Sequence, residues 1–199
     1  MGRPRKDAFD EATALRVLRA AEQVFGERGL RSARLEDIAG MAGISRPSLL
    51  YHFGSKDKLY ARVVKRAFDE IREALGVALL PPGEDRTYDA TVMAVVESLL
   101  ELEQQHRPLL GVVLRSLLEP GGASYEVVVA EFSELVAAIV QFVEAHGRER
   151  LAPGVSARDA VLQLIVTYLA RMSMGDLSGQ LWRESVVTIE PTVRALLLR

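Results

Sequence analysis

A short stretch of the sequence, residues 45–56, carries several hydrogen-bond donors close together. Apolar spacing there predicts a helix over residues 45–53 that turns Leu49 and Phe53 inward. Its outward side chains are then Arg46, Ser48, Tyr51 and His52. A guanidinium can donate to guanine O6 and N7 together, whereas hydroxyl, imidazole and ammonium groups can hold phosphate oxygens. These four residues are therefore candidates for contact with nucleic acid, although apolar spacing alone does not distinguish a DNA-binding helix pair from the short helix pairs of other all-α proteins.

The residues around this helix predict a helix-turn-helix. Four apolar residues before it recur at i, i+3, i+4 and i+7, which gives a short helix one apolar face. They are Leu35, Ile38, Ala39 and Ala42. Gly43 follows, and glycine best tolerates the left-handed backbone of a tight turn. Ser45 can cap the second helix, whose first turn tolerates Pro47. Gly54 ends that helix, and Ser55 caps the next. Two helices joined in this way can place the second in a DNA major groove.

The strings AAEQVFGERGLRSARLEDIAGMA and GISRPSLLYHFGSKDKLY make a more specific comparison possible. Together they resemble the N-terminal domain of TetR-type transcriptional repressors, from about residue 15 to residue 64. The matching positions are Phe25, Gly29, Ile38, Ala39, Gly43, Ser45, Leu49, His52, Phe53, Lys56 and Leu59. The resemblance does not extend past roughly residue 75. It implies a regulator with a DNA-binding head and a helical body.

In the helix-turn-helix geometry, Arg46 is the first candidate for reading a base, with a phosphate contact as the open alternative. Ser48 can bond to a base edge or to a phosphate. Tyr51, His52 and Lys56 are expected to hold phosphates, which set the register without reading sequence. In the family, the Lys56 position and the start of its helix commonly hold a phosphate. The full expected DNA-binding set is Arg34, Ser45, Arg46, Ser48, Tyr51, His52 and Lys56.

Two positions depart from the family pattern. Leu50 stands where the family usually has a phosphate-contacting tyrosine. Glu36 stands where the preceding helix is often basic, and phosphates would repel its carboxylate. Arg31 and Arg34 nearby can compensate for that charge. The departures leave the domain assignment intact and make the contact list less secure.

The N-terminus carries Arg3, Arg5 and Lys6 beside Pro4, without apolar periodicity. Such a basic arm can enter the minor groove beside a helix-turn-helix. The alternative is an ordinary solvated terminus, and the sequence leaves both open.

The predicted fold is all-α: a three-helix DNA-binding domain (residues 1–60) and an antiparallel helical domain (residues 61–199) joined by a long helix. The long helix is expected to belong to both. Apolar spacing places helices over residues 10–28, 55–75, 87–105, 108–118, 124–146 and 190–198, with another opened by a Ser156–Asp159 capping box. Prolines and glycines interrupt them at residues 79–86 and 119–122, and a less regular stretch surrounds Trp182.

Composition restricts the chemistry further. The 199 residues include no cysteine, which excludes disulfides, thiolate catalysis and zinc–thiolate sites. Residues 1–60 carry 11 Lys/Arg and 8 Asp/Glu, a net +3, whereas residues 61–199 carry 14 and 19, a net −5. A basic head on an acidic body suits local contact with phosphates. No apolar run is long enough for a membrane helix and no signal peptide is visible, so we expect a cytoplasmic protein with no membrane partner.

A single helix-turn-helix makes too few contacts for tight specific binding. A homodimer on a palindromic operator solves this, because the operator then mirrors the two-fold symmetry. The family dimerises through its last two long helices, here from residue 156 and over residues 190–198. The apolar ending ALLLR suits an interface. It could instead pack inside its own domain.

The resemblance also implies a small-molecule effector that enters the body and re-spaces the two recognition helices. The expected pocket residues are Met93, Arg115, Phe132, Tyr168 and Met172. For the apolar residues among them ordinary core packing is the commoner role, and for Arg115 it is an ordinary solvated position at a helix edge. They indicate a hydrophobic or aromatic effector, whose identity the sequence does not contain. Neither the operator nor the choice between repression and activation can be read from it.

Two other classes of function are alternatives for this sequence. A DNA-binding regulator without an effector would have a solvent-free body. An all-helical enzyme is the remote alternative, because the three histidines lie far apart and no HExxH or glycine-rich phosphate loop occurs. We therefore expect no catalytic residues, no metal and no cofactor.

Overall fold

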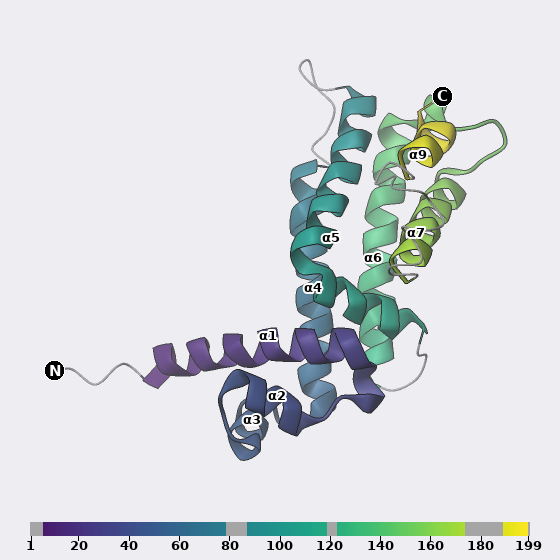
Figure 1. Ribbon diagram of the computed structural model, residues 1–199. Coiled ribbons are helices and arrows are strands. Elements are labelled where there is room, and N and C mark those ends of the chain that lie inside the picture. The colour runs from purple at the N-terminus through teal and green to yellow at the C-terminus, as the bar shows by residue number, and fades with distance from the viewer. Residues whose placement is uncertain (1–5, 79–86, 119–122, 174–188, 199) are drawn as a thin grey trace. The chain divides into compact units, whose positions relative to one another are not determined.

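The computed structural model describes residues 6–78, 87–118, 123–173 and 189–198, and every regular element within these ranges is a helix (Figure 1). The elements are α1 (Lys6–Ser32), α2 (Leu35–Ala42), α3 (Arg46–Phe53), α4 (Lys56–Ala78), α5 (Tyr88–Leu118), α6 (Ala123–His146), the 3-10 helix η1 (Arg148–Arg150), α7 (Ala157–Ser173) and α9 (Ile189–Leu197). The all-α prediction is confirmed. The expected interruptions at residues 79–86 and 119–122, the basic arm at Arg3 and Arg5, and the stretch around Trp182 lie outside the described residues.

The first helix is longer than its apolar pattern predicts. It begins at Lys6 rather than near residue 10, because polar residues such as those at its start can extend a helix without an apolar face. Gly29 interrupts it with φ 72° and ψ 174°, as its position in the sequence predicts. Only glycine adopts such a backbone readily.

The two helices expected over residues 87–105 and 108–118 form one element, α5, with a bend. His106, at φ −127° and ψ 33°, leaves the helical region just before Pro108. Proline cannot donate to the carbonyl four residues back, and its ring crowds that carbonyl. The proline therefore bends the helix and does not end it. The 3-10 helix η1 was not expected.

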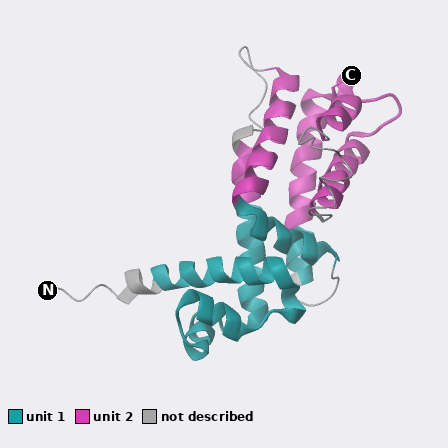
Figure 2. Ribbon diagram, viewed as in Figure 1, with its two compact units in different colours: residues 1–69, 106–130 teal, residues 70–105, 131–199 magenta. Residues whose placement is uncertain are grey.

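The chain separates into two compact units (Figure 2). Unit 1 comprises residues 1–69 and 106–130, so it includes the part of α5 that follows the bend. Its largest fully buried side chains include Phe25, Ile38, Leu49, Leu59 and Phe68. The boundary expected after residue 60 stays a prediction, whereas packing divides α4 between Asp69 and Glu70.

Unit 2 comprises residues 70–105 and 131–199. Its buried core is drawn from α5, α6, α7 and α9, with members such as Val96, Val140 and Val161. From α9, Val193 and Leu197 are 2% and 5% exposed and belong to this core. The apolar end of the chain therefore packs within its own unit, which is the alternative that the sequence left open. Among the described residues, no helix is both long and apolar enough to span a membrane.

Candidate nucleic-acid interface

The turn between α2 and α3 has the geometry that its sequence predicts. All four apolar residues of α2, Leu35, Ile38, Ala39 and Ala42, are buried. Gly43 follows in the left-handed conformation, with φ 68° and ψ 34°. The N–H of Ile44 then donates to the carbonyl of Ala39 at 3.0 Å, which closes the end of α2. The chain is thereby turned sharply into the second helix.

Helix α3 buries one face and exposes the other. Ser45 has an extended backbone, and its Oγ accepts a hydrogen bond from the Ser48 N–H at 3.2 Å. This fixes the first turn of the helix. Leu49 and Phe53 are 0% and 4% exposed, as predicted, whereas Tyr51 is 77% exposed. The expected donors thus lie on a helix whose orientation is set by its buried face.

Several expected contact residues have the exposure that binding to DNA requires. Arg34, at the extended N-cap position of α2, is exposed. Arg46 is exposed at the start of α3, and Ser48 is half-buried. His52 is half-buried, and its ring lies edge-on to that of Tyr51 with centroids 5.5 Å apart. Ser45 is exposed, although the acceptor function of its hydroxyl is already used in the cap.

An ion pair joins the two helices of the motif. The Nε of Arg46 lies 3.1 Å from Oε1 of Glu36, and both side chains are more than half exposed. Glu36 is the residue that departs from the family pattern toward negative charge. Sequence reasoning considered its repulsion of phosphates and missed its pairing with Arg46. The signal available was a pair of opposite charges on either side of a predicted turn.

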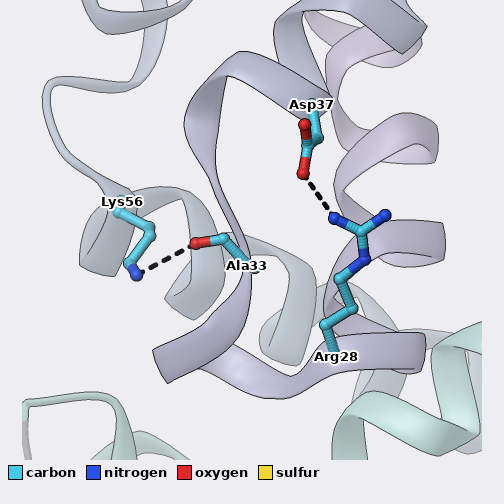
Figure 3. A network of polar contacts seen from close by, with 4 residues as sticks. All are labelled: Arg28, Ala33, Asp37 and Lys56. Carbon is cyan, nitrogen blue, oxygen red and sulfur yellow. Dashed lines mark hydrogen bonds and ion pairs between the residues drawn. The ribbon is translucent and has the colours of Figure 1, made fainter.

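Lys56 has a structural partner that the sequence did not predict. Its Nζ donates to the carbonyl of Arg31, near the end of α1, at 3.3 Å. It also donates at 3.2 Å to the carbonyl of Ala33, which lies between α1 and α2 (Figure 3). An ammonium has three donors, so one remains for a phosphate. Arg28 and Asp37 form a further ion pair between α1 and α2 in the same region (Figure 3). Lys56, at the start of α4, thus holds in place the segment that leads from α1 into α2.

The expected pocket residues fall into two groups. Met93, Phe132 and Met172 are partly buried against the core of unit 2, to which Tyr168 belongs. The Tyr168 hydroxyl donates to the Leu99 carbonyl at 3.2 Å. Burial raises the pKa of that phenol further above physiological pH. Arg115 lies in unit 1 instead, where sequence reasoning had not placed it.

Polar groups are present beside the Tyr168 ring. The Arg171 guanidinium lies 5.4 Å from the ring centroid and pairs with the Glu103 carboxylate. Both members of the pair are about four-fifths buried. Apolar walls with a few polar groups are typical of effector sites and also of ordinary helical cores. Among the described residues, no three His, Asp or Glu side chains gather in a way that could hold a metal ion.

Arg115 binds the end of the first helix. Its Nε donates to the Gly26 carbonyl at 2.9 Å, and its Nη2 donates to the Glu27 carbonyl at 2.8 Å. Next to it, the Ser116 and Tyr60 hydroxyl oxygens are hydrogen-bonded at 2.5 Å. Both contacts hold the part of α5 after the bend within unit 1. The role found for Arg115 is therefore in helix packing.

Comparison with known proteins finds similarity in the N-terminal part of the chain. Residues 17–63 match the family described as bacterial regulatory proteins, tetR family. The HTH-type transcriptional activator FasR of Mycolicibacterium smegmatis is 39% identical over 70 residues, and the HTH-type transcriptional regulator RutR of Escherichia coli is 43% identical over 53. These alignments cover 35% and 27% of this chain and 32% and 25% of the relatives. The likeness thus spans a third or less of those relatives' length.

Solved structures resemble the chain over most of its length. A TetR-like transcriptional regulator from Rhodococcus sp. RHA1 matches with a TM-score of 0.70 at 22% identity, over 92% of each chain. AibR in complex with isovaleryl coenzyme A and operator DNA matches with a TM-score of 0.69 at 13% identity, over 81% of this chain and 86% of that one. At such identities the likeness shows the fold. Both FasR and RutR are named as transcriptional regulators.

Proposed function

We propose that the protein is a dimeric, ligand-responsive transcriptional regulator of a palindromic operator, because residues 17–63 match the tetR family of bacterial regulatory proteins. The observation that carries the proposal is α3. Arg46 and Tyr51 are exposed on this helix, whereas Leu49 and Phe53 are buried and fix its orientation. A helix held in this way can enter a major groove with its donors in register. A DNA regulator in a bacterium acts in the cytoplasm, where we place the protein.

The contacts divide by chemistry. Arg46 donates to guanine O6 and N7, and Ser48 donates to a neighbouring base edge or phosphate. Phosphates are held by the remaining donor of Lys56 and by the side chains of Tyr51 and His52. Arg34 adds positive charge at the start of α2, and Ser45 contributes chiefly by fixing the first turn of α3. The half-buried position of Lys56 and its two carbonyl contacts support a preformed phosphate clamp.

Dimerisation is assigned mainly to α7. Val166 is 59% exposed on this helix, which leaves an apolar side chain available for an interface. Leu162 and Leu169 are only partly buried and lie four residues before and three after Val166, on the same helix face. Because the apolar residues of α9 are largely used inside unit 2, α9 contributes less to the interface than its sequence suggests. Two copies then present two α3 helices to two half-sites.

The effector is assigned to unit 2, beside Met93, Phe132, Tyr168 and Met172. Their apolar character supports a hydrophobic molecule, and the structure of AibR with both isovaleryl coenzyme A and operator DNA supports effector control in a protein of this fold. Release from DNA requires only that the effector bind the DNA-incompetent state more tightly. A coupling of about 1–3 kcal/mol changes operator affinity roughly 5- to 150-fold. We propose that operator binding represses transcription. Activation is the alternative, and the position of the operator relative to the promoter decides between the two.

The decisive experiment is a binding titration, at fixed salt, against the DNA immediately upstream of the protein's own gene and against a random duplex. Footprinted binding at a palindrome, with one dimer per site, supports the proposal. Binding to both duplexes that is equally weak and disappears with salt contradicts specific regulation by that site. Small molecules are then screened for release of the operator. If no compound releases the protein from the operator or raises its melting temperature, the result favours a regulator without an effector.

A further inference from the structure

The ion pair between α2 and α3 has a consequence for DNA recognition. We propose that Glu36 determines specificity by orienting Arg46 toward a guanine, an inference that rests on the proposed DNA binding. Glu36 occupies the guanidinium's Nε side, at 3.1 Å. The two terminal nitrogens, Nη1 and Nη2, remain as a planar pair of donors. That pair matches O6 and N7 of guanine.

The backbone of Arg46 is already fixed, so its side chain is what the ion pair restrains. Arg46 is the first residue of α3, and the cap from Ser45 to the Ser48 N–H holds that turn. Pro47 follows directly and restricts the backbone further. A free arginine side chain loses much rotamer freedom on binding, and a restrained one has lost part of it beforehand. The restraint therefore favours the contact in which Nη1 and Nη2 of Arg46 donate together to O6 and N7 of guanine.

The same carboxylate works against general affinity. Both side chains are exposed, 56% for Arg46 and 60% for Glu36, so the negative charge lies near any phosphate that approaches α3. A surface carboxylate there weakens binding to every duplex through repulsion. Glu36 thus lowers binding to random DNA while favouring one orientation of Arg46. The ratio of specific to random binding rises on both counts.

The neighbouring residue Asp37 provides a matched control. It also lies in the first turn of α2 and also pairs with an arginine, but that arginine is Arg28 of α1 and not a residue of α3. Both carboxylates interact favourably with the N-terminus of α2, so both neutralisations should reduce helix stability similarly. Only Glu36→Gln should alter the choice of base.

The test begins with the full-length protein and a randomised duplex pool, from which the preferred site is selected. Dissociation constants are then measured at one salt concentration for that site, for each single base-pair substitution in it, and for a random duplex. The variants are Glu36→Gln, Asp37→Asn, Arg46→Ala and the Glu36→Gln/Arg46→Ala double variant. Thermal melting of each protein reports its folding separately.

We expect Arg46→Ala to abolish the preference for guanine at one position of each half-site. Glu36→Gln should reduce that same preference about two- to fivefold, the size of a surface ion-pair interaction. It should have no such effect when Arg46 is already alanine, and Asp37→Asn should leave the preference unchanged. Tighter binding of Glu36→Gln to all duplexes, with the preference unchanged, would overturn the inference and leave only repulsion. If the wild-type protein selects no site, the proposed function itself fails.

Discussion

The contact between α1 and the part of α5 after the bend allows a stability prediction for Gly26→Ala. A Cβ on Gly26 would lie 2.3 Å from the carbonyl oxygen and 2.9 Å from the carbonyl carbon of Pro108. These are backbone atoms, so no side chain can turn aside to make room. Gly111 faces the same crossing, and a Cβ there would be 3.2 Å from the Gly26 carbonyl oxygen. The two helices must therefore separate to admit a methyl group.

The change in the free energy of unfolding on Gly26→Ala combines two destabilising contributions and one stabilising contribution. Overpacking a close contact costs about 1–3 kcal/mol. Separation of the helices also stretches the hydrogen bonds from Arg115 to the Gly26 and Glu27 carbonyls, each worth about 1 kcal/mol. Alanine returns about 1 kcal/mol through its higher helix propensity. The free energy of unfolding should therefore fall by about 2 kcal/mol.

The matched control is Gly40→Ala in α2, within the same unit. A Cβ on Gly40 would have no heavy atom within 4 Å, and the backbone there is helical. The same substitution should therefore raise the free energy of unfolding by about 0.5–1 kcal/mol. The two variants differ in sign although the chemical change is identical.

The assay is urea unfolding at 25 °C followed by far-UV circular dichroism, with wild type and both variants measured side by side. A Gly26→Ala protein as stable as wild type would refute the close crossing of α1 and α5. An equal loss in Gly40→Ala would also refute the reasoning, because the effect would then belong to glycine replacement in general. An unchanged m-value would confirm that the native and unfolded states are otherwise comparable.

Four further predictions follow from the described contacts. Arg46→Ala should weaken operator binding by about 1–3 kcal/mol and relax one base preference per half-site, whereas equal losses on random DNA would assign Arg46 to a phosphate. Lys56→Gln should lower the slope of log K against log salt by about one for each half-site; an unchanged slope would exclude the phosphate contact. Val166→Glu should convert the dimer to a monomer in sedimentation, and a dimer that survives would exclude this face of α7. Burial, with the charge of Asp89, raises the pKa of Tyr88 to about 12 against the opposing charge of Arg150. Because the unfolded phenol loses its proton near pH 10, stability should decline between about pH 10 and 12, and Tyr88→Phe should flatten that decline in urea titrations.

The helix-turn-helix could be predicted from local features of the sequence. Its signals are local: an apolar face in α2, a glycine that accepts a left-handed turn at Gly43, and a capping hydroxyl at Ser45. Each depends on neighbours within a few residues, so spacing along the chain contains the necessary information. The same reasoning correctly identified the capping interaction between Ser156 and Asp159. The exposed residues of α3 could be predicted because Leu49 and Phe53 were identified first as the buried ones.

Contacts between residues far apart in the sequence depend on how the helices pack and could not be predicted from spacing. Arg115 was expected in a pocket, yet it binds the end of α1, 88 and 89 residues away in sequence. Lys56 holds the segment before α2, Glu36 pairs with Arg46, and the apolar residues of α9 enter the core of unit 2. Periodicity shows that a helix face is apolar or charged but not which other face it contacts. That choice depends on helix crossings such as the one at Gly26, where the absence of a side chain allows two backbones to approach.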